Sequence, residues 1–345
     1  MEARPTPDLP ASGPWQFEPK WDGFRCLVFR DHGRVELQSK SAKSLTRYFP
    51  EVVAAVRSLA ARQFVLDCEL LVPQGEDLAF DLLLQRIHPA ASRVDRLSRE
   101  TPAWLVAFDL LARGSTRSLV DSPLSERRRE LEAFAGRFLD SAPAIHLSPA
   151  TGDRQQAEVW LAGLGGMDGV MAKDPTLPYA SGSRHAMWKV KRRNSADCVV
   201  GGFRRSSAGD GVGSLLLGLY DDAGRLDHVG FCSSLSARAR RRLLELLEPL
   251  VEGPGFTGDR PGGPSRWATE RSDQWLPLRP TLVLEVGYDH FTGGRFRHGT
   301  TFERWRPDKD PRQCTYDQIP QEGAGALRTL VGGSGLARQP PGQKR

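Results

Sequence analysis

The segment Glu18-Pro19-Lys20-Trp21-Asp22-Gly23-Phe24-Arg25 places one lysine between two acids and closes with a glycine and an arginine. Two strand-like runs follow it, at 26–30 and 35–39, and the turn residues Asp31-His32-Gly33 join them. This pattern predicts a β-hairpin directly after the lysine, which would then lie on a connection between strands. The other informative segments of the chain can be understood by their relation to Lys20.

Lysine is rare in this chain. It has 48 lysines and arginines, of which only eight are lysines. Arginine stays protonated in proteins, whereas a lysine can lose its proton and attack an electrophile. The retained lysines therefore indicate positions where arginine cannot substitute, and Lys20 is the candidate nucleophile. The alternative for any single lysine is an inert surface residue, so the argument depends on the contexts of the others.

Composition limits the class of protein. The chain has 345 residues, enough for two domains, with 39% hydrophobic and 26% charged residues, as is ordinary for a soluble globular protein. A net charge of +6 permits a polyanionic partner. No two of the five cysteines form a C-x-x-C pair, which argues against zinc and a disulfide framework and favours buried free thiols. Without a signal segment or a long apolar run, we expect a cytosolic protein.

The chain reads as two domains of different character. In the first part we expect helices at 50–61, 77–99, 123–138 and 153–164, with strands at 64–72, 104–111, about 145, 167–173 and 187–191. After residue 195 short strands dominate, at 197–204, 214–220, 226–232, 281–288 and 299–305, with one helix at 236–251. We therefore predict a flexible N-terminus at 1–14, an α+β domain with antiparallel sheets at 15–195, an all-β OB-fold at 196–320 and a disordered tail at 321–345.

The first domain contains several acids and lysines near strands. The acids are Glu69, Asp109 and Asp168, and the lysines besides Lys20 are Lys173, Lys189 and Lys191. Carboxylates hold Mg²⁺ and lysines contact phosphates, so this set indicates a polyphosphate and a divalent metal. No G-x-x-x-x-G-K-[ST] loop is present, which excludes a P-loop protein. The bland alternatives are salt-bridging acids, an exposed lysine face on an edge strand, and a core role for Phe108.

These segments occur in the order of a known family. The chain resembles ATP-dependent DNA ligases of the covalent nucleotidyltransferase superfamily, and it is most similar to bacterial stand-alone ligases of the ligase C kind, relatives of the ligase module of ligase D. Six of the eight lysines fall in the matching motifs. The motifs are Lys20-Trp21-Asp22-Gly23-Phe24-Arg25, Ser39-Lys40-Ser41, Leu66-Asp67-Cys68-Glu69, Ala107-Phe108-Asp109-Leu110-Leu111, Asp168-Gly169-Val170-Met171-Ala172-Lys173, Trp188-Lys189-Val190-Lys191 and Trp305-Arg306-Pro307-Asp308-Lys309.

The resemblance implies a fold and a reaction. The fold is an ATP-grasp-like ligase adenylation domain followed by an OB domain. Lys20 attacks the ATP α-phosphorus to give lysyl-AMP, AMP passes to the 5′-phosphate of a nick, and the 3′-hydroxyl then displaces AMP. The implied requirements are ATP and Mg²⁺ or Mn²⁺. The implied partners are duplex DNA with a nick or an end, and Ku or a repair polymerase, for a monomer in the cytoplasm near the nucleoid.

The resemblance also implies a role for each motif residue. Asp22 belongs to the nucleophile motif. Glu18, Phe108 and Met171 would surround the adenine, Arg25 and Glu69 would hold the ribose, and Glu69 and Asp168 would lie near the metal. Lys173, Lys189 and Lys191 would bind the α-phosphate and its neighbours. Arg306, Asp308 and Lys309 would orient the pyrophosphate when the OB domain closes, and Lys40 would contact the nick phosphate.

Two motif positions differ from the usual family residue, and two other functions stay open. Asp168 stands where most ligases have Glu, which predicts a longer or water-mediated metal contact. Lys40 stands where the family usually has Arg, so a single cation replaces a bidentate fork. The alternatives are an RNA ligase or capping-type enzyme, and a non-catalytic OB-fold protein that binds nucleic acid.

Overall fold

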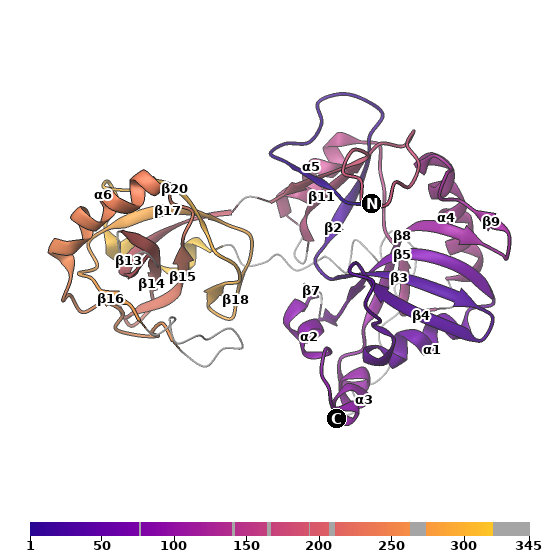
Figure 1. Ribbon diagram of the computed structural model, residues 1–345, viewed down its shortest axis with the longest axis horizontal. Helices are drawn as coiled ribbons and strands as arrows, with labels where there is room; N and C mark the ends of the chain where they lie inside the picture. The colour runs from indigo at the N-terminus through magenta and orange to yellow at the C-terminus, as the bar shows by residue number, and fades with distance from the viewer. Residues whose placement is uncertain are drawn as a thin grey trace. The chain divides into compact units, whose positions relative to one another are not determined.

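The computed structural model describes residues 1–75, 77–139, 142–163, 167–192, 194–206, 211–262 and 274–319. The predicted disordered tail at 321–345 and the turn residues 165–166 lie outside these ranges. The chain divides into two compact units, Met1–Arg192 and Arg193–Gln321, close to the boundary expected near residue 195. Figure 1 shows both units.

The larger sheet of the first unit contains the predicted hairpin. Its strand order is β10-β8-β5-β3-β4, and β9 pairs with β8. The strands are β3 (Phe24–Asp31), β4 (Arg34–Ser39), β5 (Gln63–Leu71), β8 (Trp104–Arg113), β9 (Arg117–Ser118) and β10 (Ile145–Leu147). Helices α1 (Pro50–Ser58) and α4 (Leu124–Phe138) pack against β4 and β8 and enclose an apolar core. This sheet presents one wall of the site described below.

A smaller sheet provides the other wall. Its order is β1-β12-β11-β2, with β1 (Arg4–Thr6), β2 (Gln16–Trp21), β11 (Met167–Lys173) and β12 (Met187–Lys191). Helix α5 (Arg154–Gly163) packs against β2 and β11, as Figure 1 shows. Its apolar core includes Phe17, Trp160, Val170 and Val190. Alternation along β2 and β11 leaves their other face for polar side chains.

Four expectations need correction. Residues 77–99 are not one helix. Strands β6 (Pro73–Gln74) and β7 (Asp77–Leu78) form a short ladder, and two helices follow, α2 (Phe80–Gln85) and α3 (Ala91–Glu100). The helices are separated near Pro89, because proline interrupts a helix. Residues 1–14 are not wholly loose, since β1 pairs with β12 and Leu9 is buried. Lys20 lies within β2, not on a connection. The sheets are mainly antiparallel, but the β1–β12 and β10–β8 pairs are parallel.

The second unit is a closed β-barrel of the predicted OB type. Its sheet runs β15-β14-β13-β17-β20, with β16 beside β13, and a bridge between Cys232 and Thr300 brings the two ends together. The strands are β13 (Asn194–Arg205), β14 (Val212–Tyr220), β15 (Leu226–Cys232), β16 (Leu276–Pro277), β17 (Val283–Tyr288), β18 (Phe291–Thr292), β19 (Arg295–Phe296) and β20 (Thr301–Trp305). Helix α6 (Ala237–Leu247) follows β15, and its Leu243 and Leu247 are buried.

Short 3-10 turns complete the described structure, at Thr46–Tyr48, Glu248–Leu250, Pro311–Gln313 and Tyr316–Gln318. All five cysteines are buried and free, which confirms the prediction of buried thiols. None of the helices in the described part of the chain is long and apolar enough to span a membrane.

Candidate active site

A pocket in the first unit gathers seven of the predicted site residues. Its wall from the smaller sheet and its wall from the larger sheet both carry charged and aromatic side chains. The lining residues are Glu18, Pro19, Lys20, Trp21, Arg25, Glu69, Phe108, Met171, Lys173 and Met187. In the β2–β11 ladder Lys20 lies opposite Gly169 and Glu18 lies opposite Met171. Because Glu18 and Lys20 are two residues apart on one strand, they share the pocket face.

One end of the pocket contains the nucleophile candidate and its ion-pair partner. The ammonium group of Lys20 contacts the Asp168 carboxylate directly, and Lys191 Nζ lies 3.6 Å from the same Asp168 oxygen. Burial, together with the charges of Lys20 and Lys191, lowers the pKa of Lys189. Three lysines and one acid thus meet here, and this cationic end suits a phosphate group.

A β-bulge brings Asp168 into contact with Lys20, beside the pocket-lining residues. The β2–β11 register shifts between Met167 and Gly169, and Gly169 has a φ of 140°. A Cβ added to Gly169 would lie 2.0 Å from the carbonyl oxygen of Val190. Only glycine therefore fits this position, and the bulge turns the preceding Asp168 toward Lys20.

Gly23, the glycine of the lysine motif, is restricted by close packing. A Cβ there would lie 2.2 Å from the carbonyl oxygen of Leu70. The turn after β2 thus passes directly against β5, the strand that carries Glu69. Glycine at this position lets the two walls of the pocket approach each other.

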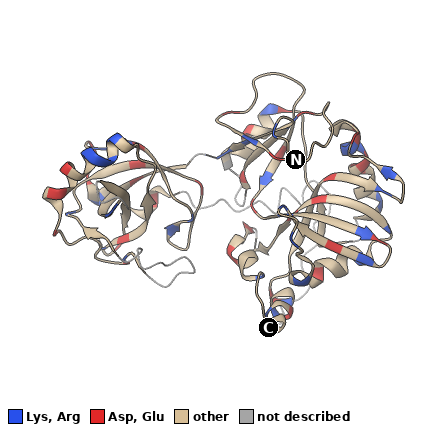
Figure 2. Ribbon diagram, in the orientation of Figure 1, with Lys and Arg blue, Asp and Glu red and all other residues tan. Residues whose placement is uncertain are grey.

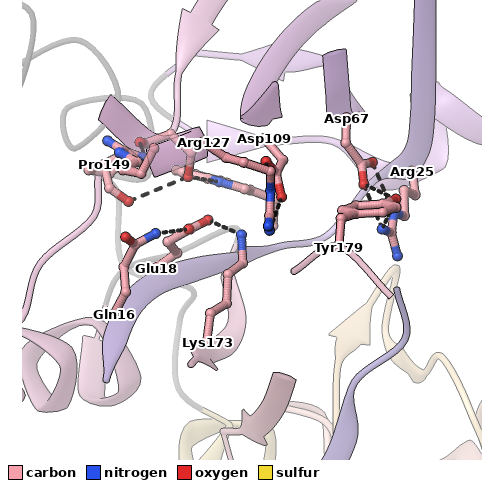
Figure 3. Close-up of polar contacts among 12 residues, drawn as sticks. Gln16, Glu18, Arg25, Asp67, Asp109, Arg127, Pro149, Lys173 and Tyr179 are labelled. Atoms are coloured by element: carbon pink, nitrogen blue, oxygen red, sulfur yellow. Dashed lines mark hydrogen bonds and ion pairs between the residues drawn. The ribbon is translucent and has the colours of Figure 1, made fainter. Parts of the chain in front are cut away.

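The other end of the pocket contains a buried acid–lysine pair. Lys173 Nζ donates to Glu18 Oε2 at 2.7 Å, and Gln16 Nε2 donates to Glu18 Oε1 at 2.7 Å (Figure 3). Lys173 Nζ also lies 4.8 Å from the centre of the Phe108 ring. The resemblance groups Lys173 with Lys189 and Lys191, but the structure places it at the Glu18 end. In the β2–β11 ladder Lys173 lies opposite Gln16. Gln16 is four residues from Lys20 along β2, which separates the two backbone positions by about 13 Å in an extended strand.

A hydrogen-bonded triad fixes Arg25. Its guanidinium donates to the two Asp67 oxygens at 3.0 and 2.6 Å, and Tyr179 donates to Asp67 at 2.8 Å (Figure 3). Arg25 also donates to the backbone oxygen of Met1. The motif with Glu69 includes Asp67, but sequence analysis gave no role to Asp67 or Tyr179. Asp67 is an acid within an apolar strand, two residues before Glu69. Because a buried carboxylate needs a partner, its position in the sequence could have indicated a basic partner.

Asp109, one of the candidate acids, has a structural partner. Arg127 of α4 donates to both of its oxygens at 2.9 and 3.0 Å, and both residues are buried (Figure 3). Arg127 also donates to the backbone oxygen of Ser122 at 2.7 Å. This pair attaches helix α4 to β8 directly beside Phe108. The salt-bridge interpretation of Asp109 is therefore the correct one.

The two predicted metal ligands, Asp168 and Glu69, both lie near Lys20. Asp168 contacts Lys20, and Glu69 lines the same pocket. Burial is the main cause that raises the pKa of Glu69 to about 8; Lys20 and Arg25 oppose the rise, and Asp67 and Asp22 add to it. Carboxylate oxygens are the ligands that Mg²⁺ prefers. The donor chemistry thus agrees with the predicted metal.

Five predicted site residues of the first unit do not line the pocket: Asp22, Lys40, Asp168, Lys189 and Lys191. Asp22 follows β2 and is half-buried. Lys40 follows β4, is 64% exposed, and lies 3.2 Å from the Glu2 carboxylate. An exposed cation near the pocket rather than in it is compatible with a contact to a large anionic ligand.

The second unit contains the last predicted motif on its own surface. Arg306 donates to both oxygens of Asp197 on β13 at 2.9 Å and to Asp308 at 2.8 Å, and Lys309 lies 3.7 Å from Asp197. The bond from Arg306 lowers the pKa of Asp308 to about 2. Sequence analysis missed Asp197, which binds Arg306 and lies near Lys309, while Asp308 is held by Arg306.

Comparison with known proteins agrees with this geometry. The model of the ATP dependent DNA ligase domain matches residues 9–191, and that of the ATP dependent DNA ligase C terminal region matches residues 208–309. DNA ligase C of Mycobacterium tuberculosis is 43% identical over 333 residues, covering 92% of each chain. The multifunctional non-homologous end joining protein LigD of Mycobacterium bovis is 33% identical over 304 residues, which are 87% of this chain and 37% of that protein.

A solved structure titled Pmar-Lig_PreS3 superposes with a TM-score of 0.58 at 18% identity, covering 85% of this chain and 63% of that one, and supports the fold alone. The two family models and the likeness to DNA ligase C extend over both units. The first model covers the lysine pocket, and the second covers most of the OB barrel. The chain belongs to the ATP-dependent DNA ligase family.

Proposed function

We propose that this enzyme joins 5′-phosphate and 3′-hydroxyl ends of DNA through a lysyl-AMP formed on Lys20. The observation that carries the proposal is the position of Lys20. Its side chain is 21% exposed in the pocket, contacts Asp168, and lies among the cations Lys189 and Lys191. A reachable amine next to a phosphate-binding cluster is the arrangement that a phosphorus electrophile requires.

The first step uses the whole length of the pocket. Glu18, Phe108 and Met171 would take the adenine, and Arg25 and Glu69 the ribose, which puts the α-phosphate at the Lys20 end. The Lys20 nitrogen forms a bond to the α-phosphorus, and the bond to the pyrophosphate oxygen breaks. Lys189 and Lys191 stabilise the charge that develops on the phosphate oxygens. Asp168, in contact with Lys20, is positioned to take the proton that the amine loses.

A divalent metal fits the same end. Asp168 and Glu69 would hold Mg²⁺ or Mn²⁺, whose charge would neutralise the polyphosphate. Lys173 has a different proposed role from Lys189 and Lys191. Its ion pair with Glu18 orients that carboxylate at the adenine end of the pocket.

The later steps would involve the second unit and the nucleic acid. Arg306, Asp308 and Lys309 would orient the pyrophosphate when the OB domain closes, and the domain would then move to bind the duplex. AMP passes from Lys20 to the 5′-phosphate, and Lys40 contacts that phosphate. Attack by the 3′-hydroxyl forms the phosphodiester bond and releases AMP.

The biological setting is also a proposal. The name of the LigD relative refers to non-homologous end joining, which suggests Ku or a repair polymerase as a partner. The family resemblance suggests that the enzyme works as a monomer, and a DNA substrate suggests that it works with the nucleoid in the cytoplasm. RNA ends are the alternative substrate.

Replacing the nucleophile tests the proposal. We expect Lys20→Arg to abolish transfer of label from α-³²P-ATP to the protein, because a guanidinium stays protonated at neutral pH. Lys43→Arg, an exposed lysine outside every motif, is the matched control and keeps full labelling. Nicked DNA and nicked RNA duplexes are then added to the labelled parent. Labelled Lys20→Arg protein would show that another residue is the nucleophile, and transfer to RNA alone would exclude DNA as the substrate.

A further inference from the structure

The first residues of the chain form a strap that passes beside the nucleotide pocket. Here the strap means residues 1–6. Its strand β1 pairs in parallel with β12, with Arg4 opposite Trp188 and Thr6 opposite Val190. Met1 is buried in a cluster with Met171, Met187 and Tyr179, and its backbone oxygen accepts a hydrogen bond from Arg25. The strap is therefore anchored on both sides of its second residue.

These anchors hold the Glu2 carboxylate between two cations. Glu2 lies 3.2 Å from Lys40 Nζ and 3.0 Å from Arg184 Nε. Lys40 and Arg184 are 64% and 66% exposed, so solvent and large ligands can reach both. Two cations that share one carboxylate are close enough to share one phosphate, whose oxygens accept the same charge-assisted hydrogen bonds.

We propose that Glu2 is a displaceable mimic of the terminal 5′-phosphate of the broken strand. The inference rests on the proposed function, in which Lys40 contacts that phosphate. In the free enzyme Glu2 neutralises Lys40 and Arg184, and the 5′-phosphate replaces Glu2 when the break binds. A terminal phosphate carries more negative charge than one carboxylate and offers three acceptor oxygens, which favours the exchange.

The exposure of the pair makes this exchange feasible. Ion pairs between solvent-exposed groups contribute little to stability, because water screens them and long side chains lose freedom when they form. Glu2 is thus held in place mainly by the anchored strap, not by the strength of its two ion pairs. Losing them changes the affinity for the break without unfolding the chain.

The test compares variants of equal charge. Affinity for a nicked duplex is measured by fluorescence anisotropy without ATP or metal, so that no reaction occurs. We expect Glu2→Gln to tighten binding of a nick with a 5′-phosphate about twofold to fivefold, the upper part of the range for an exposed ion pair. Glu100→Gln is the control, because it makes the same charge change on α3. Glu100 pairs with the exposed Arg96, not with Lys40, so we expect this variant to keep the parent affinity. In a Lys40→Gln background, Glu2→Gln gives a smaller gain.

Three outcomes would overturn the inference: equal gains in Glu2→Gln and Glu100→Gln, an equal gain for a nick with a 5′-hydroxyl, or weaker binding in Glu2→Gln. The last would mean that Glu2 positions Lys40 for the ligand. The KM for ATP in lysyl-AMP formation is also compared between Glu2→Gln and the parent. The inference expects no change in this KM, and a lower KM in the variant would mean that Glu2 competes with a phosphate of the nucleotide instead. Ligation by the parent is assayed in parallel, so failure of the proposed function is seen separately.

Discussion

Two acid–lysine pairs in one pocket differ in how readily they can separate. The Lys173–Glu18 pair is 5% and 2% exposed, whereas the Lys20–Asp168 pair is 21% and 7% exposed. Breaking a buried pair leaves an uncompensated charge and costs about 3–5 kcal/mol. Lys20 therefore can exchange its partner for a substrate phosphate at lower cost, and Lys173 is the fixed member of the pocket.

The length of the acid at position 168 gives a prediction at the same scale. We expect Asp168→Glu to lower the Mg²⁺ concentration that gives half-maximal lysyl-AMP formation, because the longer side chain reaches the cation more directly. The measurement is a titration of single-turnover labelling with metal. Asp81→Glu, an exposed acid on α2, is the control for the added methylene. An unchanged titration would show that the pocket already accommodates the shorter carboxylate.

At the scale of elements, the bulge in β11 is the feature on which the catalytic end depends. A regular strand alternates its side chains, and residues 168 and 169 would then face in opposite directions. The register shift and the positive φ of Gly169 bring Asp168 to Lys20 while Met171 and Lys173 keep their side of the ladder. Periodicity alone indicates the strand but not this local rearrangement.

Filling the bulge should therefore disrupt both stability and chemistry. We expect Gly169→Ala to destabilise the first unit by about 1–3 kcal/mol, because the left-handed backbone is strained for alanine and its Cβ meets the Val190 carbonyl. Lysyl-AMP formation should fall with it. Gly33→Ala is the control, since its Cβ would meet no atom within 4 Å. Urea denaturation and labelling are measured together, and equal stability of both variants would contradict the strain.

Strand β15 contains a buried histidine that should make the barrel sensitive to acid. Burial, followed by the charges of Arg295 and Arg204, lowers the pKa of His228 to about 3. Above pH 6.5 the imidazole is neutral in both states and contributes nothing to the pH dependence. Below pH 6.5 the unfolded chain binds a proton that the folded barrel does not. Stability is therefore lost at up to about 1.4 kcal/mol per pH unit as pH falls toward 3.

A variant isolates this contribution. The free energy of unfolding of the parent and of His228→Leu is measured between pH 7.5 and pH 4.5. The difference between them should be constant above pH 6.5 and should shift in favour of His228→Leu below it. Parallel profiles would mean that the ring is protonated in the folded barrel.

For the molecule as a whole, the net positive charge is small, but helix α6 carries a local cluster of arginines. The net charge is +6, and α6 contains Arg238, Arg240, Arg241 and Arg242, as Figure 2 shows for that helix. Arg240 is occupied by backbone oxygens of Val212 and Gly213, so it serves the fold. The other basic side chains of this helix remain at the surface, where duplex DNA can reach them.

Salt should separate the two stages of the reaction. We expect affinity for nicked DNA to fall with a log–log slope of about −0.9 for each phosphate neutralised, because bound counterions are released. Lysyl-AMP formation should respond much less, since ATP binds within a pocket. Anisotropy and labelling between 50 and 200 mM KCl measure the two. Equal sensitivity of both stages would argue against binding by a basic surface.

The sequence by itself determined the two domains, most strands, the candidate nucleophile and the family, because motif order and apolar alternation are local properties of the chain. It misjudged residues 1–14 and 77–99, where pairing with β12 and a proline break decided the outcome. Only the tertiary structure separated Lys173 from Lys189 and Lys191, and only it identified Asp67, Tyr179, Arg127 and Asp197 as partners. Ion pairs between segments far apart in the chain depend on strand register and on one bulge, and neither leaves a periodic signal in the sequence.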